Sequence, residues 1–119
     1  MRLNPRNPRS YTTYRDLGVA WFVAKRYAES IDWASRALQE RPSNIQSHIN
    51  IVLDFVGLGE IGEAKAMFET LQKVASPELL RSRLEGMWAF GRSEDRSRAT
   101  IFLRIAARLE DPSAADQVR

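Results

Sequence analysis

Residues 11–44 read YTTYRDLGVAWFVAKRYAESIDWASRALQERPSN, and this stretch decides the fold because the next 34 residues repeat its pattern. The second copy, residues 45–78, reads IQSHINIVLDFVGLGEIGEAKAMFETLQKVASPE. Leu17 and Trp21 of the first copy correspond to Ile51 and Phe55 of the second. A looser third copy follows. A repeat of this length, with apolar residues at helical spacing, predicts pairs of short helices stacked in a row, an architecture that usually presents a surface to another protein.

The apolar periodicity predicts an all-helical fold of three helix-turn-helix units. Ser10, Ser43 and Ser76 recur at 33-residue spacing, each just ahead of an apolar periodic segment, where a hydroxyl can accept a hydrogen bond from a free helix amide. Glycines such as Gly59 and Gly91 favour the breaks inside the units. The six helices are predicted near residues 11–24, 27–40, 45–58, 61–74, 77–90 and 94–109.

The chain is predicted to form one domain. Residues 11–110 hold the repeats 11–44, 45–77 and 78–110, and residues 1–10 resemble the end of a preceding repeat, as if the chain were the last part of a longer protein. Residues 111–119 lack apolar periodicity and are expected to form a flexible tail. Without a seventh helix, the last repeat is expected to leave an apolar end face, made of Ile101, Phe102, Ile105 and Leu109.

Composition points to a soluble, cytoplasmic chain. The longest apolar run, Val19 to Ala24, is too short to cross a bilayer, and the opening residues have no signal-peptide character. The absence of cysteine excludes disulfides and thiol chemistry. The net charge of +3 comes from 18 basic residues against 15 acidic ones, and acids lie among the arginines near the carboxyl-terminal end. These acids weaken the local field, so a nucleic-acid interface is disfavoured.

Three features suggest chemistry, and each has a structural explanation. Gly57, Gly59 and Gly62 satisfy the GxGxxG pattern, but they follow a predicted helix instead of a strand, which favours a helix-helix turn. His48 is the only histidine, so a zinc set or a catalytic triad is not expected. Asp54 lies in a helix that should be largely buried, and we expect an ion pair with an arginine. No catalytic residue, metal or cofactor is predicted.

The repeat resembles the tetratricopeptide repeat family. The resemblance is carried in the first unit by Tyr14, Leu17, Gly18, Trp21, Tyr27, Ser30, Ala37 and Pro42. It is good in the second unit and partial in the third, and together the three units cover residues 11–110. It implies a short right-handed solenoid of six helices, in which the first helix of each unit lines a concave groove.

The resemblance also implies which residues line that groove. The groove would be mostly apolar and would suit an amphipathic helix or a hydrophobic peptide. Whether Phe22 and Val23 face the groove or the core stays open at this point. The implied groove residues are Thr12, Arg15, Val19, Phe22, Val23, Gln46, Ile49, Leu53, Val56, Gly57, Leu79, Ser82, Gly86, Ala89 and Phe90.

A narrower resemblance concerns residues 2–42, which look like the carboxy-terminal repeats of some bacterial adenylate cyclases, where a catalytic domain precedes them. It implies a regulatory or scaffolding role in a larger signalling protein. The main hypothesis is therefore a non-catalytic module that binds a peptide or protein. The alternatives are an element for homo-oligomerisation, such as a homodimer, through apolar end faces, and a nucleic-acid accessory domain.

Overall fold

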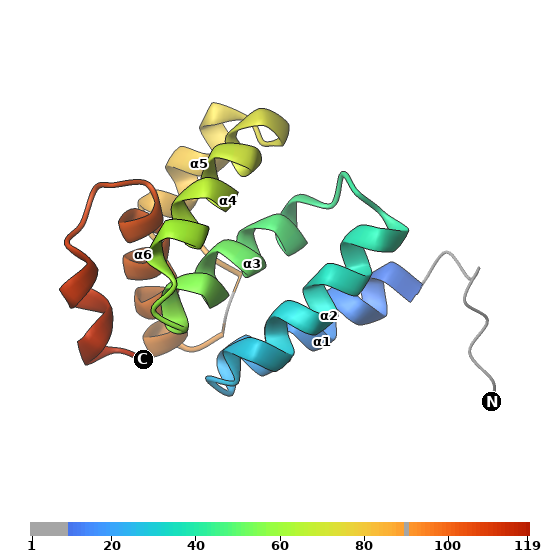
Figure 1. Ribbon diagram of the computed structural model, residues 1–119, viewed down its shortest axis with the longest axis horizontal. Helices are drawn as coiled ribbons and strands as arrows, with labels where there is room; N and C mark the ends of the chain where they lie inside the picture. Colours follow the sequence, from blue (N-terminus) through green and yellow to red (C-terminus); the bar gives the residue numbers. More distant parts are fainter. Residues whose placement is uncertain (1–9, 90) are drawn as a thin grey trace.

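The computed structural model describes residues 10–89 and 91–119, and every regular element in this part of the chain is helical (Figure 1). The all-helical prediction is confirmed. The first four helices begin and end within one residue of the predicted bounds. The elements are α1 (Ser10–Val23), α2 (Tyr27–Glu40), α3 (Ile45–Gly57), α4 (Ile61–Val74), α5 (Pro77–Leu84), α6 (Ser93–Ala106) and the 3-10 helix η1 (Pro112–Gln117).

The first four helices pack in chain order. Helix α1 lies along α2, α2 along α3 and α3 along α4, and α1 also contacts α3 (Figure 1). Gly18 allows this close approach. A Cβ atom at this position would lie 3.1 Å from Nδ2 of Asn50 in α3 and 3.4 Å from the backbone nitrogen of Ala34 in α2. A larger residue would therefore push α1 away from both neighbours.

The turn inside each of the first two units has the same backbone conformation. Lys25 and Gly59, which are 34 positions apart in the repeat, have φ angles of 64° and 81°. This left-handed conformation ends a helix at little cost for glycine, whereas for lysine it costs about 1 kcal/mol. The Lys25 ammonium group donates a hydrogen bond to the backbone carbonyl of Arg119, 3.3 Å away, so the turn is held by the other end of the chain.

The predicted helix starts are only partly right. Ser76 caps α5, since its hydroxyl accepts a hydrogen bond from the backbone N–H of Leu79. For α3 the capping residue is Asn44, not Ser43, and its side chain accepts from the N–H of Ser47 at 2.8 Å. An asparagine carbonyl caps a helix as well as a serine hydroxyl does, so two adjacent candidates cannot be separated by residue type.

The third unit departs from the repeat. Helix α5 was expected to reach residue 90, but it ends at Leu84, and Gly86 then adopts a φ of 93°. A left-handed glycine stops a helix wherever no packing opposes it. Trp88, which the repeat pattern places on a helix, lies in the non-helical connection to α6.

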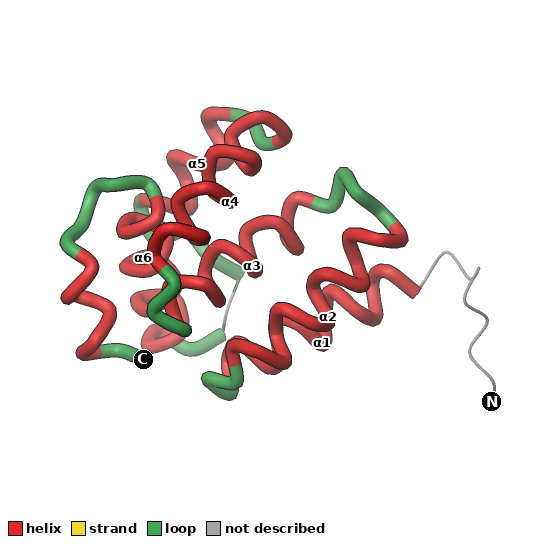
Figure 2. Tube along the Cα trace, viewed as in Figure 1, coloured by secondary structure: helices red, strands yellow, loops and turns green. Residues whose placement is uncertain are grey.

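Residues 111–119 do not form the expected flexible tail. Asp111 caps η1 by accepting a hydrogen bond from the N–H of Ser113, and Ala115 is fully buried. The short helix η1 packs against α6 (Figure 2). The Arg119 guanidinium donates to the carbonyls of Val56 and Gly57, both at 3.0 Å, and so satisfies the carboxyl end of α3. Residues 111–119 are therefore held in place by contacts with residues that are distant in the sequence.

The core is centred on α3 and α6. Helix α6 packs against α3 and α4, and Phe102 meets Phe22 of α1 edge to face, with ring centroids 6.2 Å apart. Phe102 and Ile105 are fully buried, so the predicted apolar end face is wrong for these residues. Of the four residues predicted to form it, only Leu109 is strongly exposed. None of the described helices is long and apolar enough to cross a membrane.

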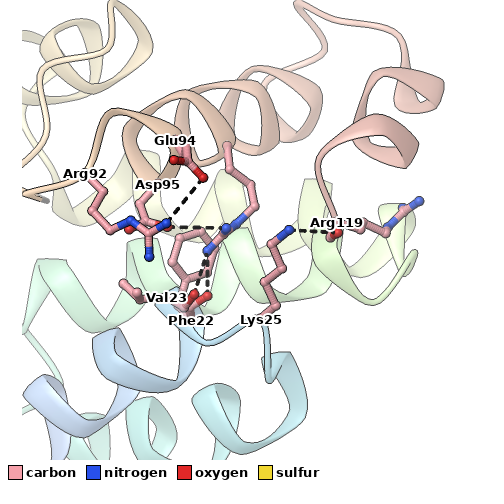
Figure 3. Close-up of polar contacts among 8 residues, drawn as sticks. Phe22, Val23, Lys25, Arg92, Glu94, Asp95 and Arg119 are labelled. Carbon is pink, nitrogen blue, oxygen red and sulfur yellow. Dashed lines mark hydrogen bonds and ion pairs between the residues drawn. The ribbon is translucent and has the colours of Figure 1, made fainter.

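A buried arginine joins α6 to α1. The Arg98 guanidinium donates to the carbonyl of Phe22 at 2.7 Å, pairs with Asp95 at 3.4 Å, and lies 4.6 Å from the centre of the Phe22 ring. Its partners Phe22 and Asp95 are labelled in Figure 3. Arg98 therefore caps the carboxyl end of α1, as Arg119 caps that of α3. The first helices of the first two units, α1 and α3, therefore each have their carboxyl end capped by an arginine from the last 22 residues of the chain.

Candidate partner-binding pocket

The centre of the implied groove is not open. Phe22, Leu53 and Val56 are fully buried, and Ile49 is almost so. Helix α6 packs against α3, and its Phe102 contacts Phe22 near the carboxyl end of α1. The implied groove role of these four residues is therefore wrong. The open question about Phe22 is answered in favour of the core.

The other implied groove residues have different surroundings. Gly57 is buried under Tyr27, where an added Cβ atom would lie 2.7 Å from the ring. Phe90 lies outside the described residues. The remaining residues of this group are half-buried, and none of them lines the pocket described next: Thr12, Val23, Leu79, Ser82 and Gly86.

Four implied groove residues do come together, beside the buried centre. Arg15 and Val19 of α1, Gln46 of α3 and Ala89 of the connection after α5 line a pocket of about 270 Å³. Its other wall comes from α5 and the connection that follows it. We call this the α1–α5 pocket, and its lining residues are Arg15, Asp16, Val19, Gln46, Arg83, Trp88 and Ala89.

The indole of Trp88 is held firmly in the wall of the α1–α5 pocket. Its Nε1 donates a hydrogen bond to the hydroxyl of Thr100 in α6 at 2.9 Å. The Arg83 guanidinium lies 5.6 Å from the centre of the indole ring and donates to the carbonyl of Met87 at 2.8 Å. These contacts fix both side chains before any partner binds, which lowers the entropy cost of binding.

The two arginines give the pocket its polar character. Arg15 pairs with Asp16 at 3.2 Å, using Nε and Nη2, and its side chain is one-third exposed. A guanidinium has five N–H donors and remains protonated at neutral pH. Arg15 and Arg83 therefore keep donors beyond these contacts, next to the apolar surfaces of Val19 and Ala89. The pocket can hold an apolar group beside a hydrogen-bond acceptor.

Sequence reasoning missed part of this pocket. Asp16 and Arg83 were not expected to line it, and Trp88 was expected within the helix predicted near residues 77–90. Arg83 and Trp88 reach the pocket because α5 ends early. The only sign of this early end in the sequence is the glycine at position 86, which follows Glu85. A glycine inside an apolar periodic segment permits an end but does not require one.

The residues that suggested chemistry have structural roles. Gly57 ends α3, Gly59 lies in the turn and Gly62 lies in α4, so the GxGxxG pattern is the predicted helix-helix turn. The Nε2 atom of His48 lies 3.0 Å from the carbonyl of Pro42, and the ring is mostly buried. Within residues 10–89 and 91–119, no three side chains of metal-ligating type gather at one point.

Asp54 lacks the expected arginine partner. Its side chain is fully buried, and neither carboxylate oxygen has a hydrogen-bond partner among the described residues. Arg98 pairs with Asp95 instead. Burial raises the pKa of Asp54 from 3.8 to about 8, against the lowering effects of the Ser30 hydroxyl and Arg98. The Ser30 hydroxyl donates its hydrogen bond to the carbonyl of Gly18 and not to Asp54, so the effect of burial on the pKa dominates. We therefore expect the Asp54 carboxyl group to be neutral at pH 7.

This raised pKa predicts that stability falls as the pH rises. The unfolded chain releases the Asp54 proton near its ordinary pKa of 3.8, whereas the folded chain holds it until about pH 8. Between about pH 5 and pH 7 the free energy of unfolding should fall by about 2.5 kcal/mol through this group alone. Asp54→Asn should remove this dependence, as measured by urea unfolding at both pH values. The exposed control Asp16→Asn should keep it, and an equal slope for Asp54→Asn and the wild type would refute the assignment.

The α1–α5 pocket is thus the place where implied groove residues of the first two units meet residues of the third unit.

No family model, curated protein or solved structure matches this chain.

Proposed function

We propose that this chain is a non-catalytic helical repeat module of the tetratricopeptide type, which binds a peptide or protein partner in the α1–α5 pocket. The repeat in residues 11–78 and the packing of α1 to α4 in chain order support the repeat architecture. The observation that carries the binding role is the convergence of Arg15, Gln46 and Trp88, one from each unit, on one pocket.

The chemistry of the lining indicates the kind of partner. The pocket offers guanidinium donors, a glutamine amide and an indole, and arginine and tryptophan are the residues that most often dominate the energy of protein interfaces. Its lining holds no histidine, serine or cysteine, and its one carboxylate, Asp16, pairs with Arg15. A partner segment with an apolar side chain next to a carbonyl or carboxylate would match it.

The proposal can be tested with a random peptide library displayed on phage and selected against the purified chain. Peptides that are enriched would be synthesised, and their affinities measured by fluorescence anisotropy. We expect Arg15→Ala to weaken binding by about tenfold or more, because it removes donors from a partly buried site.

The matched control is Arg36→Ala. Arg36 is an exposed arginine of α2 whose guanidinium lies over Trp33, away from the pocket lining. Both variants should keep the circular dichroism spectrum of the wild type. Peptides that bind the two variants equally well, or a library that yields no binder, would refute the pocket as the binding site.

A further inference from the structure

A second and larger hollow lies between the carboxyl-terminal helices. It has a volume of about 530 Å³, and we call it the α4–α6 groove. It is open because α5 ends early and makes few contacts with α4. The groove is separate from the α1–α5 pocket and shares no lining residue with it. Its apolar lining consists of Phe68, Ala75, Leu80, Leu84 and Leu109.

The groove lining includes a strongly exposed apolar side chain, and a second exposed apolar residue precedes a lining residue in the chain. Leu109 lines the groove and is 53% exposed, and Val74, next to the lining residue Ala75, is 43% exposed. Only two other large hydrophobic residues in the described part of the chain are as exposed, Leu58 and Met87. An apolar hollow beside projecting apolar side chains is typical of a surface that is covered in the functional state.

The charges at the groove indicate what covers it. Arg81 and Glu85 both line it, and within the residues that the structure describes their side chains form no ion pair or hydrogen bond. Arg104 also lines it and lies 4.0 Å from Glu110. Both signs of charge therefore occur here: Arg81, Arg104 and Glu85 line the groove, and Glu110 lies outside the lining beside Arg104. A wholly acidic or wholly basic partner would match only some of these charges, whereas a second copy turned by a two-fold axis offers each charge its opposite.

We propose that the α4–α6 groove is the interface of a two-fold symmetric dimer of this chain. Leu109 of each copy covers the apolar lining of the other, and Arg81 of each copy faces Glu85 of the other. In a two-fold interface the same patch serves both copies, so every favourable contact occurs twice. The dimer leaves the α1–α5 pocket free for its own partner.

The dimer is tested by light scattering after size exclusion, with the full chain over a wide concentration range. The mass should rise from 13.6 kDa toward twice that value. Leu109→Glu should weaken the dimer by about tenfold or more, since it places a charge in the apolar centre. The control Met87→Glu changes an exposed apolar residue outside the groove lining and should leave the mass curve unchanged.

A charge exchange tests the orientation of the two copies. Arg81→Glu alone places like charges opposite each other twice, and so does Glu85→Arg alone, so each variant should dimerise more weakly than the wild type. An equimolar mixture of the two variants should form a mixed dimer, because each remaining charge then meets its opposite. Both positions are exposed, and circular dichroism should show unchanged helix content.

Three outcomes would overturn the proposal. A constant mass of 13.6 kDa at every concentration would show that the groove does not bind a second copy. A dimer that Leu109→Glu and Met87→Glu affect equally would place the interface elsewhere. A mixture of the two charge variants that stays as monomeric as each variant alone would exclude the facing of Arg81 and Glu85.

Discussion

Phe22→Glu is expected to unfold the chain at neutral pH. The Phe22 ring is fully buried and contacts both Tyr27 and Phe102, with centroids 5.9 Å and 6.2 Å away. Truncating a buried phenylalanine costs about 3–5 kcal/mol, and a buried carboxylate without a partner costs several kcal/mol more. Because a domain of this size has about 5–15 kcal/mol of stability in total, little or none would remain. Circular dichroism and thermal unfolding measure the loss.

The matched control is Ala20→Glu, which places the same side chain on the exposed face of the same helix. Its effect on the free energy of unfolding should stay within about 0.5 kcal/mol. A Phe22→Glu variant that keeps the helix content and unfolding temperature of the control would show that the ring faces an open groove after all. That result would restore the apolar groove that the resemblance implied.

Arg98→Met is expected to lower the free energy of unfolding by about 3–5 kcal/mol, the usual cost of removing one partner of a buried ion pair. The Arg98 and Asp95 side chains are 4% and 6% exposed, and the guanidinium also satisfies the carbonyl of Phe22. Methionine can fill much of the space of the arginine stem, so the loss reflects the charge and its hydrogen bonds. Urea unfolding at neutral pH is the measurement.

The control is a second arginine that lies at the same distance from its carboxylate partner. Arg92 and Glu94 also lie 3.4 Å apart, but both are strongly exposed (Figure 3). Arg92→Met should therefore cost no more than about 1 kcal/mol. Adding Asp95→Asn to Arg98→Met should recover part of the stability, because it removes the buried charge left behind. Equal losses for Arg98→Met and Arg92→Met would contradict the anchoring role of Arg98.

Part of this molecule could be predicted from residue patterns alone. The bounds of α1 to α4, the close approach at Gly18 and the turn at Gly59 follow from helical spacing and from the conformational freedom of glycine. The helix bounds and the turn depend on residues close together in the chain, whereas the approach at Gly18 joins helices that the repeat itself places side by side. Asp54 was flagged correctly as a buried acid, but the expected ion pair was wrong because Arg98 pairs with its own neighbour, Asp95.

The candidate site shows the same division. Arg15, Val19 and Gln46 were expected on the groove side of their helices, and they do line one pocket. The pocket also depends on Arg83 and Trp88, whose positions follow from the end of α5 at Leu84. Local sequence allows a longer α5 as readily as a short one, so that wall was not predictable.

Helical periodicity identifies the apolar face of a helix, but it does not identify what covers that face. In this chain α6 covers the face of α3 that an open solenoid would leave as a groove, and its Phe102 contacts Phe22 near the carboxyl end of α1. Arg98 and Arg119 then close the ends of α1 and α3 from 76 and 62 residues away. Contacts across such distances depend on how the whole chain returns on itself, because the free energy of burial is shared among helices that no local pattern connects.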